Sequence, residues 1–239
     1  MKKLLISLSS LLLLSIYLTA CQGTEEEQVD GKGEEESEVH TDEEHVHHNH
    51  NHEHDHSHNE ENQQIYDGYF EDGQVENREM SDWEGDWQSV YPYLLSGDLD
   101  EVFEHKSEDG EMTEEAYKDY YTVGYKTDVD HILIEDNVVT FFENDKEYSG
   151  EYVSDGYEIL TYEAGNRGVR FIFKLVDGSE DMPSYIQFSD HNIFPVDSNH
   201  FHLYWGDDRE QLLEEVTNWP TYYPSHLDAD DLVHDMLAH

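Results

Sequence analysis

The sequence predicts a mainly β protein: an antiparallel barrel, closed or nearly closed, with added short helices. From Asp128 to Trp205, short segments in which apolar and polar residues alternate follow one another, with turn residues between them. Helical patterns precede and follow this region. A series of short strands at such spacing is typical of a sheet that closes on itself. We expect five to seven strands.

Turn residues divide the strand region. Asp136 and Asn137 stand between two alternating runs and predict a two-residue hairpin turn, and the Gly-Asn-Arg-Gly stretch at 165–168 predicts another. The predicted strands cover residues 131–135, 138–144, 148–162, 169–176, 184–194 and 200–205.

Helical patterns lie on both sides of the strands. A helix is expected within 111–127, with Thr113 as its N-cap and tyrosines along one side. Two short helices are expected over 208–216 and 227–239. Trp83 and Trp87, which precede all of these, are expected to pack in the core.

The chain divides into three parts by composition. Residues 1–20 read as a signal peptide, in which Lys2 and Lys3 precede a short apolar run. Residues 21–64 hold many acidic and histidine side chains and few large apolar ones, so burial cannot offset the entropy of ordering, and a disordered tether is expected. Residues 65–239 are rich in aromatic and aliphatic residues and fit one folded domain.

Cys21 is the sole cysteine of the sequence, which excludes an intrachain disulfide. It follows Leu-Thr-Ala, and this ending resembles the lipobox of bacterial lipoproteins. The resemblance implies cleavage before Cys21 and lipidation of its sulfur, which would anchor the protein to the cell membrane on its extracytoplasmic side. A plain secretory signal is the alternative.

The formal net charge of −46 comes from 58 acidic and 12 basic residues. Such a surface repels phosphate backbones and anionic lipids, so neither nucleic acid nor a charged membrane surface is an expected partner. An acidic field favours cations instead.

Residues 40–58 hold nine histidines in nineteen positions. Neutral imidazoles interleaved with carboxylates bind Zn(II), Ni(II) or Cu(II), and the pattern does not choose among these metals. A solvated spacer is the alternative. An apparent zinc-protease motif at 52–56 is rejected, because no apolar stripe would dock the helix that this motif requires. The accessory metal ligands predicted in this tract are His45, His47, His48, His50, His52, His54, His56 and His58.

A second group of histidines lies near a turn between two predicted strands. With a period of two, His191 shares a face with Gln187 and Ser189. His200 and His202 share a face of the following strand. If the two strands pair as a hairpin, all three histidines meet on one side and can reach a common metal. Three imidazoles suit Zn(II), whereas three incidental polar side chains on a hydrated strand face remain the alternative.

Longer motifs run in order from about Tyr69 to His239. They are SDWEGDWQSVYPYLLSGDLD, VGYKTDVDHILIED, GNRGVRFIF, YIQFSDHNIFP, HFHLYWGDD and NWPTYYP. These motifs resemble the ZinT (YodA) family of extracytoplasmic zinc-binding proteins, and the similar domain of some streptococcal zinc-uptake lipoproteins.

The resemblance implies a lipocalin-like (calycin) barrel and a zinc site built from the histidine of SDH and both histidines of HFH, here His191, His200 and His202. It also implies capture of Zn(II) and support of zinc uptake, by passing the metal to the solute-binding protein of an ABC transporter. Some members respond to cadmium, and Cd(II), Ni(II) or Cu(II) are expected competitors.

Other functions stay open at this point. Metal buffering or detoxification at the cell surface needs the same site. A zinc-dependent hydrolase would use the same three histidines with a bound water, but no carboxylate stands at a suitable spacing, and no enzyme activity is expected. A small-ligand carrier would have Tyr185, Gln187 and Tyr204 lining the barrel. The other histidines, His105, His131, His226, His234 and His239, are expected to be surface or core residues.

Overall fold

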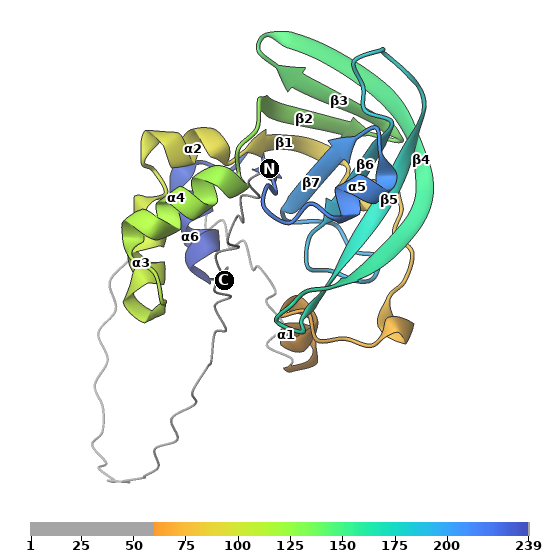
Figure 1. Cartoon of the computed structure of the whole chain (residues 1–239). Coiled ribbons are helices and arrows are strands. Elements are labelled where there is room, and N and C mark those ends of the chain that lie inside the picture. Colours follow the sequence, from red (N-terminus) through yellow and green to blue (C-terminus); the bar gives the residue numbers. More distant parts are fainter. Residues whose placement is uncertain (1–59, 239) are drawn as a thin grey trace, which may run out of the picture.

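Eight antiparallel strands close into a barrel in the computed structural model, which describes residues 60–238 (Figure 1). The predicted signal peptide, Cys21, the histidine tract and His239 lie outside the described residues. Each strand pairs with the next in sequence, and β1 pairs with β8 to close the barrel. The strands are β1 (Gly85–Ser89), β2 (Val129–Glu135), β3 (Val138–Glu143), β4 (Lys146–Thr161), β5 (Arg167–Gly178), β6 (Tyr185–Ser189), β7 (Phe201–Gly206) and β8 (Thr221–Pro224).

The predicted mainly β fold is confirmed, but the predicted number of strands, five to seven, was too low. The predicted hairpin is present, with Glu135 of β2 paired to Val138 of β3 across the two-residue turn. The sequence did not predict β1 and β8, the two strands that close the barrel. Both are short, and β8 ends at Pro224, a residue that lacks the N–H needed for a sheet hydrogen bond.

Large apolar side chains fill the inside of the barrel. Alternate residues of every strand point inward, and Phe141, Phe188 and Leu203 are among those that are fully buried. Trp83 and Trp87 belong to the same cluster, as predicted. The barrel is therefore a packed core rather than an open cup.

This packing corrects one prediction. Tyr185, Gln187 and Tyr204 do not line the barrel, because their neighbours in the strands occupy the inner positions and the period of two turns these three outward. Gln187 is fully buried on the outer side, where its Nε2 donates to the carbonyl of Arg209 at 3.0 Å.

Residues 60–238 also contain six α-helices and two 3-10 helices. They are α1 (Glu60–Tyr66), η1 (Asp72–Gln74), η2 (Met80–Trp83), α2 (Tyr91–Ser96), α3 (Asp100–Asp109), α4 (Glu114–Gly124), α5 (Arg209–Leu213) and α6 (Ala229–Ala238). The predicted N-cap is confirmed, since Thr113 accepts from the backbone N–H of Ala116 at 3.3 Å. Within residues 60–238, none of the helices has the length and apolar character needed to cross a membrane.

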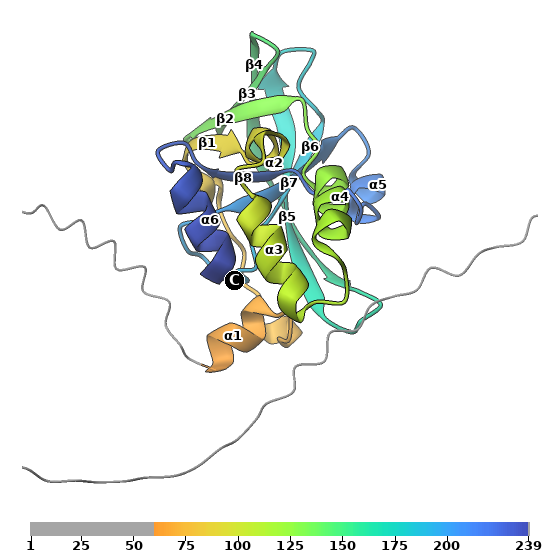
Figure 2. The same ribbon diagram turned by 90° about the vertical axis from the view of Figure 1, so that its left-hand side faces the viewer.

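Four of these helices form a layer on one side of the barrel. Figure 2 shows α2, α3, α4 and α6 gathered beside β1 and β8. A second hydrophobic cluster holds this layer together, with Leu94, Phe103 and Leu232 in its centre and Tyr223 of β8 joining it to the sheet. The region between the sheet and the helices thus has a core of its own.

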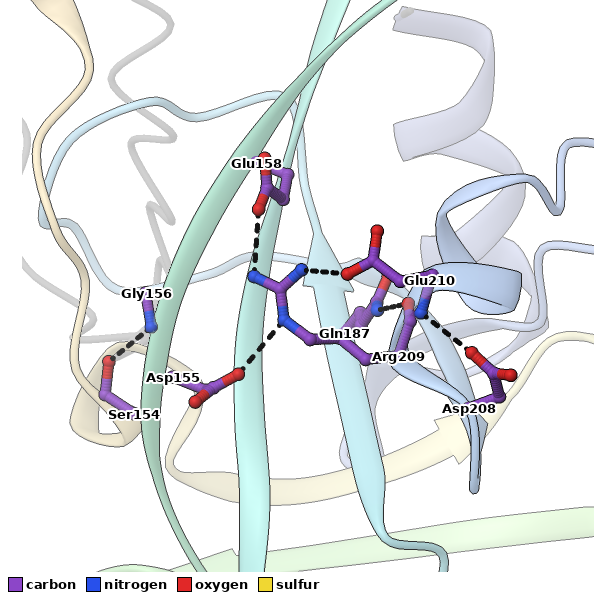
Figure 3. A network of polar contacts seen from close by, with 8 residues as sticks. All are labelled: Ser154, Asp155, Gly156, Glu158, Gln187, Asp208, Arg209 and Glu210. Carbon is purple, nitrogen blue, oxygen red and sulfur yellow. Dashed lines mark hydrogen bonds and ion pairs between the residues drawn. The ribbon is translucent and has the colours of Figure 1, made fainter.

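The short helix α5 is fixed to the outer face of the barrel by charges. Its Arg209 contacts three carboxylates, those of Asp155, Glu158 and Glu210, at 2.9–3.0 Å (Figure 3). Asp208 caps the helix and accepts from two backbone N–H groups at 3.1 Å. α5 therefore lies over β4 and β7, apart from the layer of four helices.

Candidate metal centre

The three histidines predicted as ligands come together at one edge of β6 and β7. His202 lies within β7, His200 directly precedes that strand, and His191 follows β6. The ring centroids are 6.1 Å apart for His191 and His200, 5.7 Å for His191 and His202, and 6.2 Å for His200 and His202. The rings thus form a nearly regular triangle.

Strand pairing explains why they meet. Ser189 of β6 pairs with His202 of β7, and continuing this register places His191 opposite His200, as predicted. One detail differs from the prediction. The paired strand ends at Ser189, and His191 adopts a left-handed conformation with φ 65° in the turn.

A buried ion pair fixes the turn that carries His191. Asp190 faces away from the histidines, and its Oδ1 accepts from Nη1 of Arg78 at 2.6 Å and from the backbone N–H of Asn192 at 3.2 Å. Both charged side chains are fully buried. Since removing one member of such a pair is strongly destabilising, this contact holds the turn in one conformation.

The histidines lie on the outer side of the barrel, facing the helical layer. A cavity of about 330 Å³ opens between them and residues of α3, α4 and α6, among them Phe103, Tyr121 and Met236. A second cavity of about 380 Å³ lies between β7 and α5, and none of the described histidines lines it. The first cavity is therefore the candidate site, although the second is larger.

Aromatic rings support two of the histidines. His191 stacks on Tyr66 of α1 with centroids 4.5 Å apart, and its Nδ1 lies 3.3 Å from the Tyr66 carbonyl oxygen. His200 stacks on Tyr223 of β8 at 4.9 Å. A carbonyl only accepts, so His191 donates from Nδ1 and keeps its Nε2 lone pair for a ligand.

His202 is oriented by Thr221, its partner across β7 and β8. The Thr221 hydroxyl donates to the Trp219 carbonyl at 2.9 Å, so it accepts from Nδ1–H of His202 at 2.8 Å. Nε2 of His202 is then unprotonated, which is the form that binds a metal. Neither Tyr66 nor Thr221 was predicted as part of the site, because each comes from an element that the sequence pattern around the histidines does not reveal.

Burial keeps His202 neutral. Desolvation lowers the pKa of His202 well below its usual range, and His191, His200 and Arg170 lower it further. A ligand that is already unprotonated binds a metal without first releasing a proton.

The geometry can be compared with that of bound zinc. With Zn–N distances of about 2.0–2.1 Å in a tetrahedron, three imidazole centroids would lie roughly 5 Å apart. Within residues 60–238, no three His, Cys, Asp or Glu side chains lie close enough together to hold a metal ion without some movement. The observed triangle is roughly 1 Å wider than the tetrahedral value, a difference that small changes of the histidine side-chain torsions can close. The donor set therefore fits zinc.

The other described histidines lie away from this site. His131 contacts Asp86, and its ring packs at a tilt against Phe142 with centroids 4.9 Å apart. His105 lies on α3, 3.9 Å from Glu108. His226 and His234 are exposed, in agreement with the prediction of surface positions.

Comparison with known proteins identifies the family. A family model described as ZinT (YodA), periplasmic, lipocalin-like and zinc-recruiting matches residues 61–239. The chain belongs to the ZinT family. This confirms the resemblance predicted from the sequence motifs, and with it the lipocalin-like fold.

Relatives of the ZinT type agree with this assignment. A probable metal-binding protein of Bacillus subtilis, YrpE, is 64% identical over 182 residues, which cover 76% of this chain and 72% of that protein. The zinc-binding lipoprotein AdcA of Streptococcus pneumoniae is 48% identical over 184 residues, or 75% of this chain. The matched region is only 36% of AdcA, so this chain corresponds to about a third of that lipoprotein.

Two solved structures are similar in fold. The Zn(II)-bound ZinT-like domain of S. pneumoniae AdcA superposes with a TM-score of 0.70 at 47% identity, covering 72% of this chain and 97% of that domain. Zn(II)-bound AdcA itself gives a TM-score of 0.71 at 48% identity, covering 73% of this chain and 38% of AdcA. The chain is thus a metal-recruitment protein of the ZinT type, a family described as periplasmic, and the descriptions of its relatives name metal binding and no reaction.

Proposed function

We propose that His191, His200 and His202 bind one Zn(II) on the outer face of the barrel, and that the protein supports zinc uptake by passing this ion to the solute-binding protein of an ABC transporter. The observation that carries the proposal is the triangle of three supported imidazoles. Two of these rings present an unprotonated Nε2 by virtue of their Nδ1 contacts. The Zn(II)-bound state of the related ZinT-like domain supports zinc as the metal.

Three protein ligands suit transfer rather than permanent storage. Zinc held by three histidines keeps a fourth position for an exchangeable ligand, through which an acceptor can enter before the first ligands leave. The cavity of about 330 Å³ leads to this position from the side of the helices. Cd(II), Ni(II) and Cu(II) would compete for the same nitrogen donors.

The histidine tract and the lipid anchor complete the proposal. The tract at 40–58 would gather metal at modest affinity, with its carboxylates raising the local cation concentration. Lipidation of Cys21 would hold the collector at the outer side of the cell membrane. In this arrangement the tract collects zinc, and the histidine site of the folded domain holds it for transfer.

Competition with a chelator of known affinity tests the metal site. The full chain is compared with a variant in which His191, His200 and His202 are alanine, both in a background whose tract histidines are serine. We expect one tight zinc site in the first protein and none in the second. A control with His105, His226 and His234 changed to alanine removes three exposed histidines and should bind like the parent. Equal binding by the parent and the first triple variant would refute the site.

A transfer assay tests the transporter partner. Zinc-loaded protein is mixed with a zinc-free solute-binding protein of an ABC transporter, and the rate of zinc movement is followed as the acceptor concentration rises. Direct transfer predicts a rate that increases with acceptor concentration. A rate fixed by zinc dissociation alone would instead favour buffering or detoxification at the cell surface.

A further inference from the structure

The cavity beside the three histidines differs in charge from the rest of the molecule. The chain has 58 acidic residues against 12 basic ones, yet the described residues that line this cavity include neither aspartate nor glutamate. The formally charged side chain among them is Lys106, on α3. Within residues 60–238, a protein of net charge −46 thus lines its candidate zinc site with a lysine and with no carboxylate.

Lys106 is turned toward this cavity. Its Nζ lies 6.0 Å from the centroid of the Tyr121 ring, and burial lowers the pKa of Lys106. Lys118, on the neighbouring helix α4, pairs with Asp100, whereas no carboxylate in the described part of the chain forms such a pair with Lys106.

A carboxylate of the chain does lie behind the cavity wall. Asp235 of α6 accepts from the Tyr223 hydroxyl at 3.0 Å, and its charge adds to burial in raising the pKa of Tyr66. Tyr66 and Tyr121 also line the cavity, and burial raises the pKa of each to about 12, so both are neutral at physiological pH. Among the described lining residues, these phenols therefore add no negative charge.

Zinc binding would leave this cavity with uncompensated positive charge. Three neutral imidazoles do not reduce the charge of Zn(II), and Lys106 adds one more. In a partly buried site, an anion in the fourth zinc position is then strongly favoured over a neutral water. Carboxylate oxygens bind zinc at about 2.0–2.2 Å and accept well from ammonium and hydroxyl groups.

We propose that the cavity binds zinc together with a small organic carboxylate, with one carboxylate oxygen in the fourth zinc position and the other facing Lys106. This inference rests on the proposed zinc site. The cavity of about 330 Å³ lies at the lower end of the range of about 300–1,000 Å³ found for small-molecule sites, which suits a small organic acid. The cargo is then a zinc–carboxylate complex, and loss of the carboxylate opens the site for release.

Cobalt spectroscopy tests the ternary complex. The full chain with its tract histidines changed to serine is loaded with Co(II), whose visible spectrum reports its ligands, and is titrated with acetate. We expect a saturable spectral change. Lys106→Met should weaken acetate binding about tenfold or more, as expected for the loss of a charge-assisted hydrogen bond, while Lys106→Arg retains most of it.

Two controls define the result. Lys146→Met removes the same charge from an exposed position in β4 and should leave acetate binding unchanged. Chloride at equal ionic strength should bind more weakly than acetate. Equal weakening by both lysine variants, or equal binding of chloride, would overturn the inference.

The titration also separates this inference from the proposed function. Cobalt binding without any response to acetate would refute the carboxylate ligand and leave the three-histidine site intact. Failure of the unmodified cavity to bind cobalt or zinc would refute both.

Discussion

The two faces of β6 and β7 use alternate residues of the same strands for different purposes. The inner face presents Phe188, Phe201 and Leu203, all fully buried in the barrel core. The outer face presents His202 within β7, and its neighbours His191 and His200 stand at the ends of the strands. The fold is lipocalin-like, but its barrel is filled, and the candidate site lies outside it.

The two faces are also held together by different interactions. Inside, aromatic rings pack on one another, as Phe188 does on Trp83 at 4.6 Å between centroids. Outside, each histidine has a particular support, such as Thr221 for His202 or Tyr66 for His191. Substitutions inside should therefore lower stability and leave metal affinity intact, whereas substitutions outside should lower metal affinity and cost less stability.

The largest effect is expected from Phe188→Ala. Removing this fully buried ring leaves a cavity in the barrel core and should lower the free energy of unfolding by about 3–5 kcal/mol, as measured by denaturant unfolding. The zinc affinity of the folded fraction should not change, since the side chain points away from the histidines. Phe188→Leu leaves a smaller cavity, so its free energy of unfolding should lie between those of Phe188→Ala and the parent. A parallel loss of zinc affinity would show that the two faces are coupled.

Thr221→Val tests the outer face. Valine keeps the shape of threonine but removes the acceptor for Nδ1–H of His202, so the imidazole loses its fixed orientation. We expect zinc affinity to fall about 10–100-fold, with a loss of stability of only about 1–3 kcal/mol. Thr140→Val, in β3, is the matched control and should leave the affinity measured by chelator competition unchanged. An unchanged affinity in Thr221→Val would mean that this hydroxyl does not orient the ligand.

Much of the difference between the two faces could be predicted from the sequence, because it depends on the alternation of residues along each strand. The hairpin at Asp136 and Asn137 follows from a period of two and a two-residue turn. The meeting of His191 with His200 follows from the same period and from the pairing of β6 with the next strand in sequence. The sequence did not show which face of β6 and β7 points into the barrel. Both faces become buried, one in the barrel core and the other beneath helices. Gln187, a polar residue with no exposed surface, lies on the outer face under α5, where it donates to the Arg209 carbonyl.

The closure of the barrel and the supports of the site could not be predicted, because they join residues far apart in sequence. β1 pairs with β8 through Gln88 and Tyr223, and neither short strand has a clear alternating pattern. Thr221 reaches His202 only once β8 is in place. Tyr66 similarly belongs to α1, whose residues 60–64 were predicted to be part of the disordered tether and are helical instead. Nothing in the sequence around Tyr66 indicates a histidine partner.

The smallest effect is expected in the pH dependence of the zinc-free protein. The pKa of His202 is well below its usual range in the folded state, through burial and the nearby His191, His200 and Arg170, whereas in the unfolded chain it returns to about 6.5. Between these two values the unfolded state binds the proton and the folded state does not. Stability contributed by this group is therefore fully present above about pH 6.5 and is lost as the pH falls.

One such proton gives a slope of at most about 1.4 kcal/mol per pH unit. Unfolding free energies measured from pH 7 to pH 5 should therefore decline more steeply in the parent than in His202→Gln, which keeps a polar side chain but cannot titrate. Parallel curves would mean that His202 is as easily protonated in the folded state as in the unfolded chain, and that burial under the helices does not hold it ready for a metal.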